Sequence, residues 1–258
     1  MMARILQIAR NTFREAIRDR VLYNLIVFAL LMAGASVLVG QISIEIERLV
    51  VVNLGLSAVS LFGTLIAIFI GIGLVSKEID KKTLYTVLAR PVRRWEFIVG
   101  KFLGLGGTLV VNTIFMALGV FAALLYVTHK FERADVPVLA ALYLIVLQLI
   151  IMTALALFFS SFSSPVLSAV MAFAMFIIGT FAEDLRGFAA ISTGFVKAAA
   201  TFAAYIVPNF AAMNVISQSA HGQPVAGSLI VFNTLYALLY SGAALAGAVL
   251  IFERRNLK

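Results

Sequence analysis

The chain has 258 residues, of which 62% are apolar and only 12% are charged, and its mean hydropathy is +1.06. An ordinary soluble domain has roughly a quarter of its residues charged, and a core of this size buries only about three quarters of the chain's surface. This composition excludes a soluble enzyme, a disordered chain and a disulfide-rich secreted module. It indicates a polytopic membrane protein. The sequence contains no Cys, which excludes thiol catalysis, iron–sulfur clusters and disulfides.

Charge-free apolar runs predict an all-α fold of six transmembrane helices within a single membrane domain, residues 1–258. A helix crosses a hydrocarbon core of about 30 Å in about 20 residues. A membrane β-barrel would show alternating rather than continuous apolar residues. The runs are 21–40, 54–75, 103–127, 138–159, 166–182 and 228–252.

The distribution of basic residues predicts the orientation of these spans. If the N-terminus is cytoplasmic, 15 of the 20 Lys and Arg residues fall in inner segments, as the positive-inside tendency requires. Both termini are then cytoplasmic in the plasma (inner) membrane. The net charge of +8 is explained by this orientation, and we expect no nucleic-acid partner.

Residues 1–20 are predicted to form an amphipathic helix that lies flat on the inner leaflet. Apolar residues recur at helical spacing from Ile5 to Ile17, and most of the basic residues lie on the other side. The alternative is the start of a cleaved signal peptide with its cut at 33–36, but the apolar run is too long for that.

The outer segment 183–227 contains a stretch, 187–207, that is apolar enough for a seventh span. Lys197 would then lie in mid-span, and the basic C-terminus would lie outside. We therefore interpret 187–207 as a helical excursion on the outer face that ends at Pro208-Asn209. A surface-lying, a re-entrant and a spanning arrangement all remain open.

The larger polar residues within the spans are few; they include Thr153 and Tyr240. The candidates for a substrate path are Asn112, Gln148, Asn233 and Tyr236. Interhelical hydrogen bonding is the simpler interpretation of each of them. Small residues spaced for helix contact include Gly63 and Gly71, Gly100 and Gly104, and Ala243 and Gly247. Ser163-Ser164-Pro165 predicts an N-cap followed by proline at the first helical position.

No pattern predicts catalysis, a bound cofactor or a metal ion on this chain. His129 and His221 lie in outer loops without partners at metal-ligand spacing. Gly100-Lys101 is not a P-loop, because Trp95 occupies the position of the first glycine. The spans lack the charges that an ion-coupled carrier needs. The outer acids are interpreted as solvated loop ends; they are Glu45, Glu47, Glu132, Asp135, Glu183 and Asp184.

The inner loop 76–101 carries ten charged residues and predicts a short helix over 83–89. Leu84, Val87 and Leu88 give this helix one apolar face, and Pro91 ends it. A second helix begins near Arg93 and continues into the third span. The pattern favours a helix-in-groove contact with a cytoplasmic partner. The alternative is a solvated loop anchored to the inner leaflet by its basic residues.

This loop also resembles a known family. Its elements are Gly71, Ser76-Lys77-Glu78, Asp80-Lys81-Lys82-Thr83-Leu84, Leu88-Ala89-Arg90-Pro91-Val92-Arg93-Arg94 and Gly100-Lys101. They resemble the loop between the second and third spans of type-2 ATP-binding-cassette (ABC) export permeases, in the subgroup of copper-processing and gliding systems. The segment 9–16, the six-span plan and the Glu253-Arg254-Arg255 ending resemble the same family.

The resemblance implies a permease subunit that dimerises and docks separate cytoplasmic ATPase subunits, which hold ATP and Mg. The helix at 83–89 becomes the coupling helix, and the N-terminal helix becomes the connecting helix beside it. The implied ATPase-coupling residues are Glu78, Thr83, Leu84, Val87, Leu88, Arg90, Pro91, Arg93 and Arg94. The expected function is export of a hydrophobic or amphipathic substrate.

Three other functions are compatible with a multi-pass protein. They are an intramembrane hydrolase or lipid-modifying enzyme, an ion-coupled carrier and a structural scaffold. The sequence does not choose between a homodimer and a heterodimer, and it does not identify the substrate.

Overall fold

The computed structural model describes residues 2–16, 47–80, 94–130 and 132–254, together with isolated positions between 27 and 38. Every regular element in this part of the chain is helical. The predicted all-α class is therefore confirmed for the described residues. The predicted run 21–40 lies mostly outside them.

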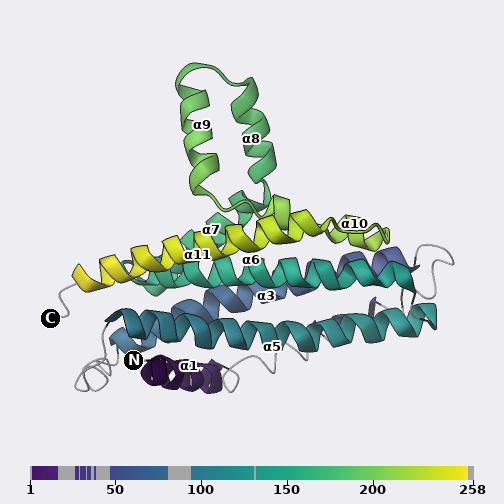
Figure 1. Cartoon of the computed structure of the whole chain (residues 1–258), viewed down its shortest axis with the longest axis horizontal. Coiled ribbons are helices and arrows are strands. Elements are labelled where there is room, and N and C mark those ends of the chain that lie inside the picture. Colours follow the sequence, from purple (N-terminus) through teal and green to yellow (C-terminus); the bar gives the residue numbers. More distant parts are fainter. Residues whose placement is uncertain are drawn as a thin grey trace.

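Four long helices lie side by side and form a bundle (Figure 1). They are α3 (Glu47–Asp80), α5 (Arg94–Thr128), α6 (Val136–Ser160) and α11 (Gly227–Arg254). Each contains a segment long and apolar enough to cross a membrane. These segments coincide with the predicted runs 54–75, 103–127, 138–159 and 228–252, which confirms four apolar helices at those places.

The chain between α6 and α11 contains two bent pairs of helices. The first pair is α7 (Pro165–Thr180) and α8 (Ala182–Ile191), which meet at 65°. The second joins α9 (Gly194–Ile206) to the short helices η3 (Ala211–Met213) and α10 (Ile216–Ala220), with a bend of 46°. The described chain thus has four helices of membrane length, and six if each bent pair forms one span. At about 1.5 Å per residue, α7 alone is about 24 Å long and shorter than a hydrocarbon core.

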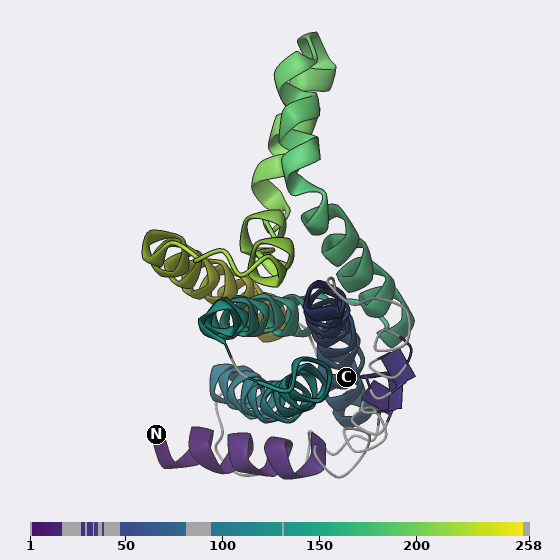
Figure 2. The same cartoon turned by 90° about the vertical axis from the view of Figure 1, so that its right-hand side faces the viewer.

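Helices α8 and α9 form a hairpin that stands away from the bundle, roughly perpendicular to its long helices (Figures 1 and 2). The helix α9 ends at Ile206, because Val207 precedes Pro208 and takes an extended conformation with ψ of 135°. The chain then returns to the bundle, where α10 packs against α3 and α6.

The core is built around α6, which contacts α3, α5, α7 and α11. It is apolar on all sides, as expected of a helix with neighbours all round, and Leu144, Leu149 and Met152 are completely buried. Small residues line its contacts. A Cβ added to Gly63 would lie 2.7 Å from Leu149, and one added to Gly247 would lie 2.9 Å from Phe158. Both glycines therefore lie where helices approach closely.

The turn between α6 and α7 has the predicted proline but a different capping arrangement. Pro165 is the first residue of α7 and Ser164 occupies the N-cap position. The Ser164 side chain makes no capping hydrogen bond. Instead the Ser163 hydroxyl donates to the Phe159 carbonyl at 2.9 Å and lies 2.6 Å from the Ser168 hydroxyl. The side chain of Ser163 therefore stabilises this turn.

Candidate functional site

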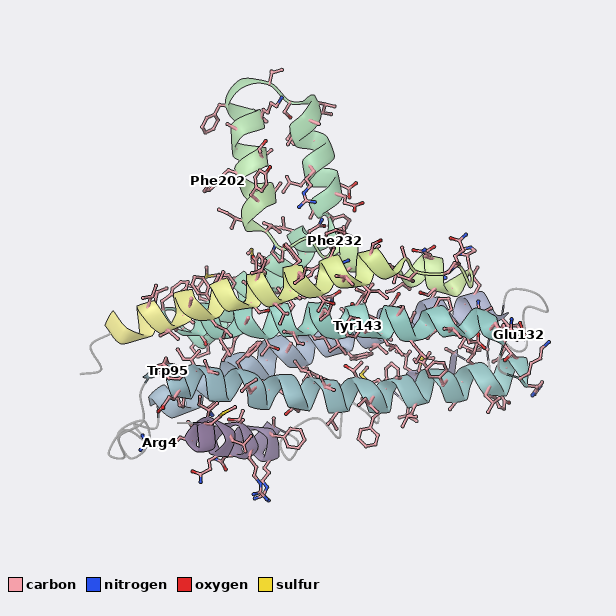
Figure 3. The ribbon with its side chains drawn as sticks, viewed as in Figure 1. Arg4, Trp95, Glu132, Tyr143, Phe202 and Phe232 are labelled. Carbon is pink, nitrogen blue, oxygen red and sulfur yellow. The ribbon has the colours of Figure 1, made fainter. Side chains whose placement is uncertain are left out.

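The helix α1 (Met2–Ala16) crosses α5 near one end of the bundle, roughly perpendicular to the long helices (Figures 1 and 2). We call this the Trp95 end, and the opposite end the Glu132 end, after the residues labelled in Figure 3. Ala9, Thr12 and Ala16 face the bundle and are buried, whereas Arg10 and Arg14 are exposed. One side of α1 therefore packs on α5 and the other presents positive charge.

Two glycines of α5 allow α1 to lie this close. A Cβ added to Gly104 would lie 2.5 Å from the carbonyl oxygen of Ala9 and 2.7 Å from the Thr12 Cβ. One added to Gly100 would lie 2.7 Å from the Ile8 side chain. These glycines were predicted to serve helix contact, and the partner helix is α1. Because the closest atom at Gly104 is backbone, a side-chain rotation of α1 cannot relieve that contact.

The helices that flank the predicted coupling segment have their adjoining ends at the same end of the bundle. The helix α3 ends at Asp80 and α5 begins at Arg94, both at the end of the bundle where α1 lies (Figure 1). Glu78 therefore lies in the last turn of α3, and Arg94 is the first residue of α5. The other predicted coupling residues lie outside the described residues; they are Thr83, Leu84, Val87, Leu88, Arg90, Pro91 and Arg93.

The start of α5 buries two charged residues of the predicted loop 76–101. Glu96 and Lys101 are only 2% and 3% exposed. The Lys101 ammonium lies 5.6 Å from the centre of the Phe97 ring, a distance at which cation–π attraction operates. The expected second helix near Arg93 is confirmed, and part of the loop's charge lies inside the fold rather than in solvent.

Two of the four residues predicted for a substrate path lie in contacts within the bundle. Gln148 of α6 donates hydrogen bonds to the hydroxyls of Ser60, at 3.0 Å, and Thr64, at 3.1 Å, both on α3. Asn112 of α5 is fully buried, and its amide nitrogen lies 3.4 Å from the sulfur of Met116. Its Oδ1 atom has no hydrogen-bond partner among the described residues. Gln148 thus connects α3 to α6.

The other two, Asn233 and Tyr236, lie together on α11 and contact the non-helical chain after α9. The Tyr236 hydroxyl accepts a hydrogen bond from the backbone N–H of Asn209 at 3.0 Å. The Asn233 amide donates to the carbonyl of Ala212 at 3.2 Å. Irregular backbone among membrane-spanning helices needs such internal partners. The structure therefore brings this pair together at the chain after α9, whereas Gln148 hydrogen-bonds to α3 and Asn112 contacts Met116 of its own helix.

The contacts of Gln148 predict a modest effect of its loss. We expect Gln148→Leu to lower the stability of the detergent-solubilised protein by about 0.6 kcal/mol, and by at most about 1.7 kcal/mol, the range for hydrogen bonds between membrane helices. Thr153→Val is the matched control, because the Thr153 hydroxyl donates its hydrogen bond to the Leu149 carbonyl of its own helix. Thermal unfolding of both variants tests this expectation. Equal losses for the two would contradict an interhelical role for Gln148.

Arg48 makes a cluster of contacts that the sequence did not reveal. Its Nε donates to Asp135 Oδ1 at 2.9 Å, its Nη1 donates to the Ala220 carbonyl at 2.5 Å, and its Nη2 donates to the Ala134 carbonyl. The interpretation of Asp135 as a solvated loop end is wrong, since it is 6% exposed and paired with Arg48. The guanidinium fork joins α3, α10 and the turn η2 (Arg133–Asp135) before α6. Only the tertiary fold brings these carbonyls together.

A bundle of long apolar helices, crossed at one end by a basic helix, defines a multi-pass membrane protein. Residues 6–257 match the family described as ABC-2 family transporter protein, and the chain belongs to that family. No curated protein matches the sequence. The family provides the membrane-spanning transport subunit rather than a catalytic subunit, and membership implies a cytoplasmic ABC ATPase as partner.

Proposed function

We propose that this chain dimerises and, with two cytoplasmic ATPase subunits, forms an ABC exporter of a hydrophobic or amphipathic substrate. The observation that carries the proposal is the family match over nearly the whole chain, on a bundle of membrane-length helices. In this proposal the protein lies in the plasma (inner) membrane with both termini in the cytoplasm. The positive-inside distribution of Lys and Arg supports that orientation.

The ATPase would dock at the Trp95 end. Leu84, Val87 and Leu88 are spaced for one apolar helix face, which suits a groove on a soluble partner. The exposed Arg10 and Arg14 of α1 lie at the same end of the bundle as the two helices that flank this segment. ATP-driven movement of the partner would be transmitted to the bundle through the helix at 83–89 and through α1. ATP and Mg would bind to the partner.

Charge placed on the apolar face of 83–89 should uncouple the complex. We expect Leu84→Asp, Val87→Asp and Leu88→Asp each to reduce the co-purified ATPase by about tenfold or more, because a carboxylate buried in an apolar groove costs several kcal/mol. Thr86→Asp is the control, since position 86 points to the opposite side of the same predicted helix.

The measurement is the amount of P-loop ATPase that co-purifies from native membranes, together with the rate of ATP hydrolysis by the complex. Equal losses for Thr86→Asp and Leu88→Asp would overturn the assignment of the apolar face. Normal ATPase content and activity in all three face variants would overturn the coupling helix itself.

The dimer and the substrate path are tested separately. Mass measurement of the purified complex should give two copies of this chain, or one copy with a related permease. The residues predicted to line the substrate path are still Asn112, Gln148, Asn233 and Tyr236. The resemblance to copper-processing and gliding permeases is likewise still a prediction about the kind of exporter. A transport defect of Asn112→Ala without loss of stability would support a path role for that residue.

A further inference from the structure

The hairpin of α8 and α9 borders an open hollow of about 330 Å³ with basic side chains along it. Arg186 enters from α8, and Lys197, Thr201 and Tyr205 enter from α9. The remaining lining residues are alanines, whose small side chains leave the space open. Two positive charges and two hydroxyl groups thus face one hollow.

Neither cation is neutralised by the described chain. Arg186 and Lys197 are exposed, and neither makes a hydrogen bond or an ion pair there. Glu183 and Asp184 lie three and two residues before Arg186 on α8, but neither forms an ion pair with it among the described residues. Two cations that line one hollow without a counter-ion from the described chain attract an anion electrostatically. The hollow therefore suits a negatively charged group.

A second hollow, of about 500 Å³, lies between α6, α7 and α11 at the base of the hairpin. Its lining is apolar, with Phe158, Met175 and Ala244 among its residues. The hydroxyl of Tyr240 also lines it but donates to the Ile206 carbonyl at 2.7 Å, so that polar group is already satisfied. Its volume falls in the range of about 300–1,000 Å³ that is usual for small-molecule sites.

Each hollow has a lining residue in the last turn of α9. Tyr205 lines the basic hollow, and its neighbour Ile206 lines the apolar one. The hairpin base meets the bundle here, beside α7 and α11 (Figures 1 and 2). This shared turn favours a ligand with an anionic head at the basic hollow and an apolar tail at the apolar one.

We propose that this composite site binds one anionic phospholipid from the bilayer. Phosphate suits the guanidinium of Arg186, which can make two parallel hydrogen bonds to it, and the ammonium of Lys197 adds a second charge. The apolar hollow is bounded by helices α6 and α11, both of membrane length. Lipid acyl chains would therefore surround it and could fill it. The site requires no nucleotide and no transport, and its existence is independent of the proposed exporter function.

The test uses the full chain reconstituted in nanodiscs of equal parts phosphatidylglycerol and phosphatidylcholine, followed by detergent extraction and native mass spectrometry. Wild type should retain phosphatidylglycerol in preference to phosphatidylcholine. Arg186→Gln with Lys197→Gln should lower phosphatidylglycerol retention about tenfold or more, since the double change removes both charged donors to the phosphate. Both residues are exposed, so the fold should tolerate the changes.

Two further variants separate the parts of the site. Ala244→Phe should reduce phosphatidylglycerol retention with both cations intact, because it fills the apolar hollow. Lys130→Gln with Arg133→Gln removes two exposed positive charges near the Glu132 end and should leave retention unchanged. Equal retention of the two lipids by wild type, or unchanged retention in the Arg186 and Lys197 variant, would overturn the proposal.

Discussion

Replacing Arg48 with alanine is expected to lower the stability of the protein by about 3 kcal/mol. The change leaves the Asp135 carboxylate, only 6% exposed, without its ion-pair partner. Loss of one member of a buried ion pair costs about 3–5 kcal/mol, and the partial exposure of Arg48 places it at the lower end. Two backbone carbonyls, of Ala134 and Ala220, lose their donor at the same time. Unfolding in a detergent titration measures the loss.

A second ion pair at the same end of the bundle provides the control. The Lys130 ammonium lies 2.6 Å from Glu132 Oε1, and this hydrogen bond raises the pKa of Lys130. Both of these side chains are largely exposed, and exposed pairs contribute little. Lys130→Gln should therefore leave stability unchanged. Arg48→Lys should behave more like Arg48→Ala, because an ammonium cannot reproduce the guanidinium fork. If Arg48→Lys were as stable as the unchanged protein, a positive charge at position 48 would be enough for stability and the expected role of the guanidinium geometry would be wrong.

Replacing Gly104 with valine is expected to displace α1 from α5. The new Cβ would lie 2.5 Å from the Ala9 carbonyl oxygen, so the backbone of α1 must move. Overpacking of this kind costs about 1–3 kcal/mol. Thr12 is 1% exposed on the contact face and the natural chain has no cysteine, so Thr12→Cys reports the displacement. We expect maleimide labelling of that cysteine to become about tenfold faster or more when Gly104→Val is added.

Gly106→Val is the matched control for this experiment. A Cβ added to Gly106 meets no atom within 4 Å, although the residue lies only two positions along the same helix. Both variants replace a helical glycine with the same β-branched residue, so intrinsic helix effects cancel. Protection of the Thr12→Cys thiol in the Gly104→Val protein would contradict the close crossing of α1 and α5.

Helices with continuous apolar sequence could be predicted well. The four runs that became α3, α5, α6 and α11 owe their structure to lipid, which forces backbone groups to pair within each segment. The sites of close helix contact at Gly63, Gly104 and Gly247 were also predictable, because small residues at regular spacing mark close approach. The spacing could not predict which helix contacts each glycine, because that depends on the tertiary arrangement.

Features that depend on long-range contacts could not be predicted. Asp135 looks like a surface acid until the fold places Arg48, 87 positions away, beside it. The capping role of Ser163 rather than Ser164 depends on how closely α6 and α7 turn. The sequence predicted a helical excursion over 187–207, but its hairpin arrangement with α8 depends on tertiary packing that apolar sequence with interspersed charge does not specify.

The unbroken length of α5 has a mechanical consequence. Its 35 residues, at about 1.5 Å each, make a rod of about 50 Å with no proline along it. Because Gly104 brings the backbone of α1 against this rod near its first turns, a tilt imposed on the crossing helix would swing the far tip through a larger arc. A small displacement of α1 at the Trp95 end would in this way produce a larger displacement of α5 at the Glu132 end.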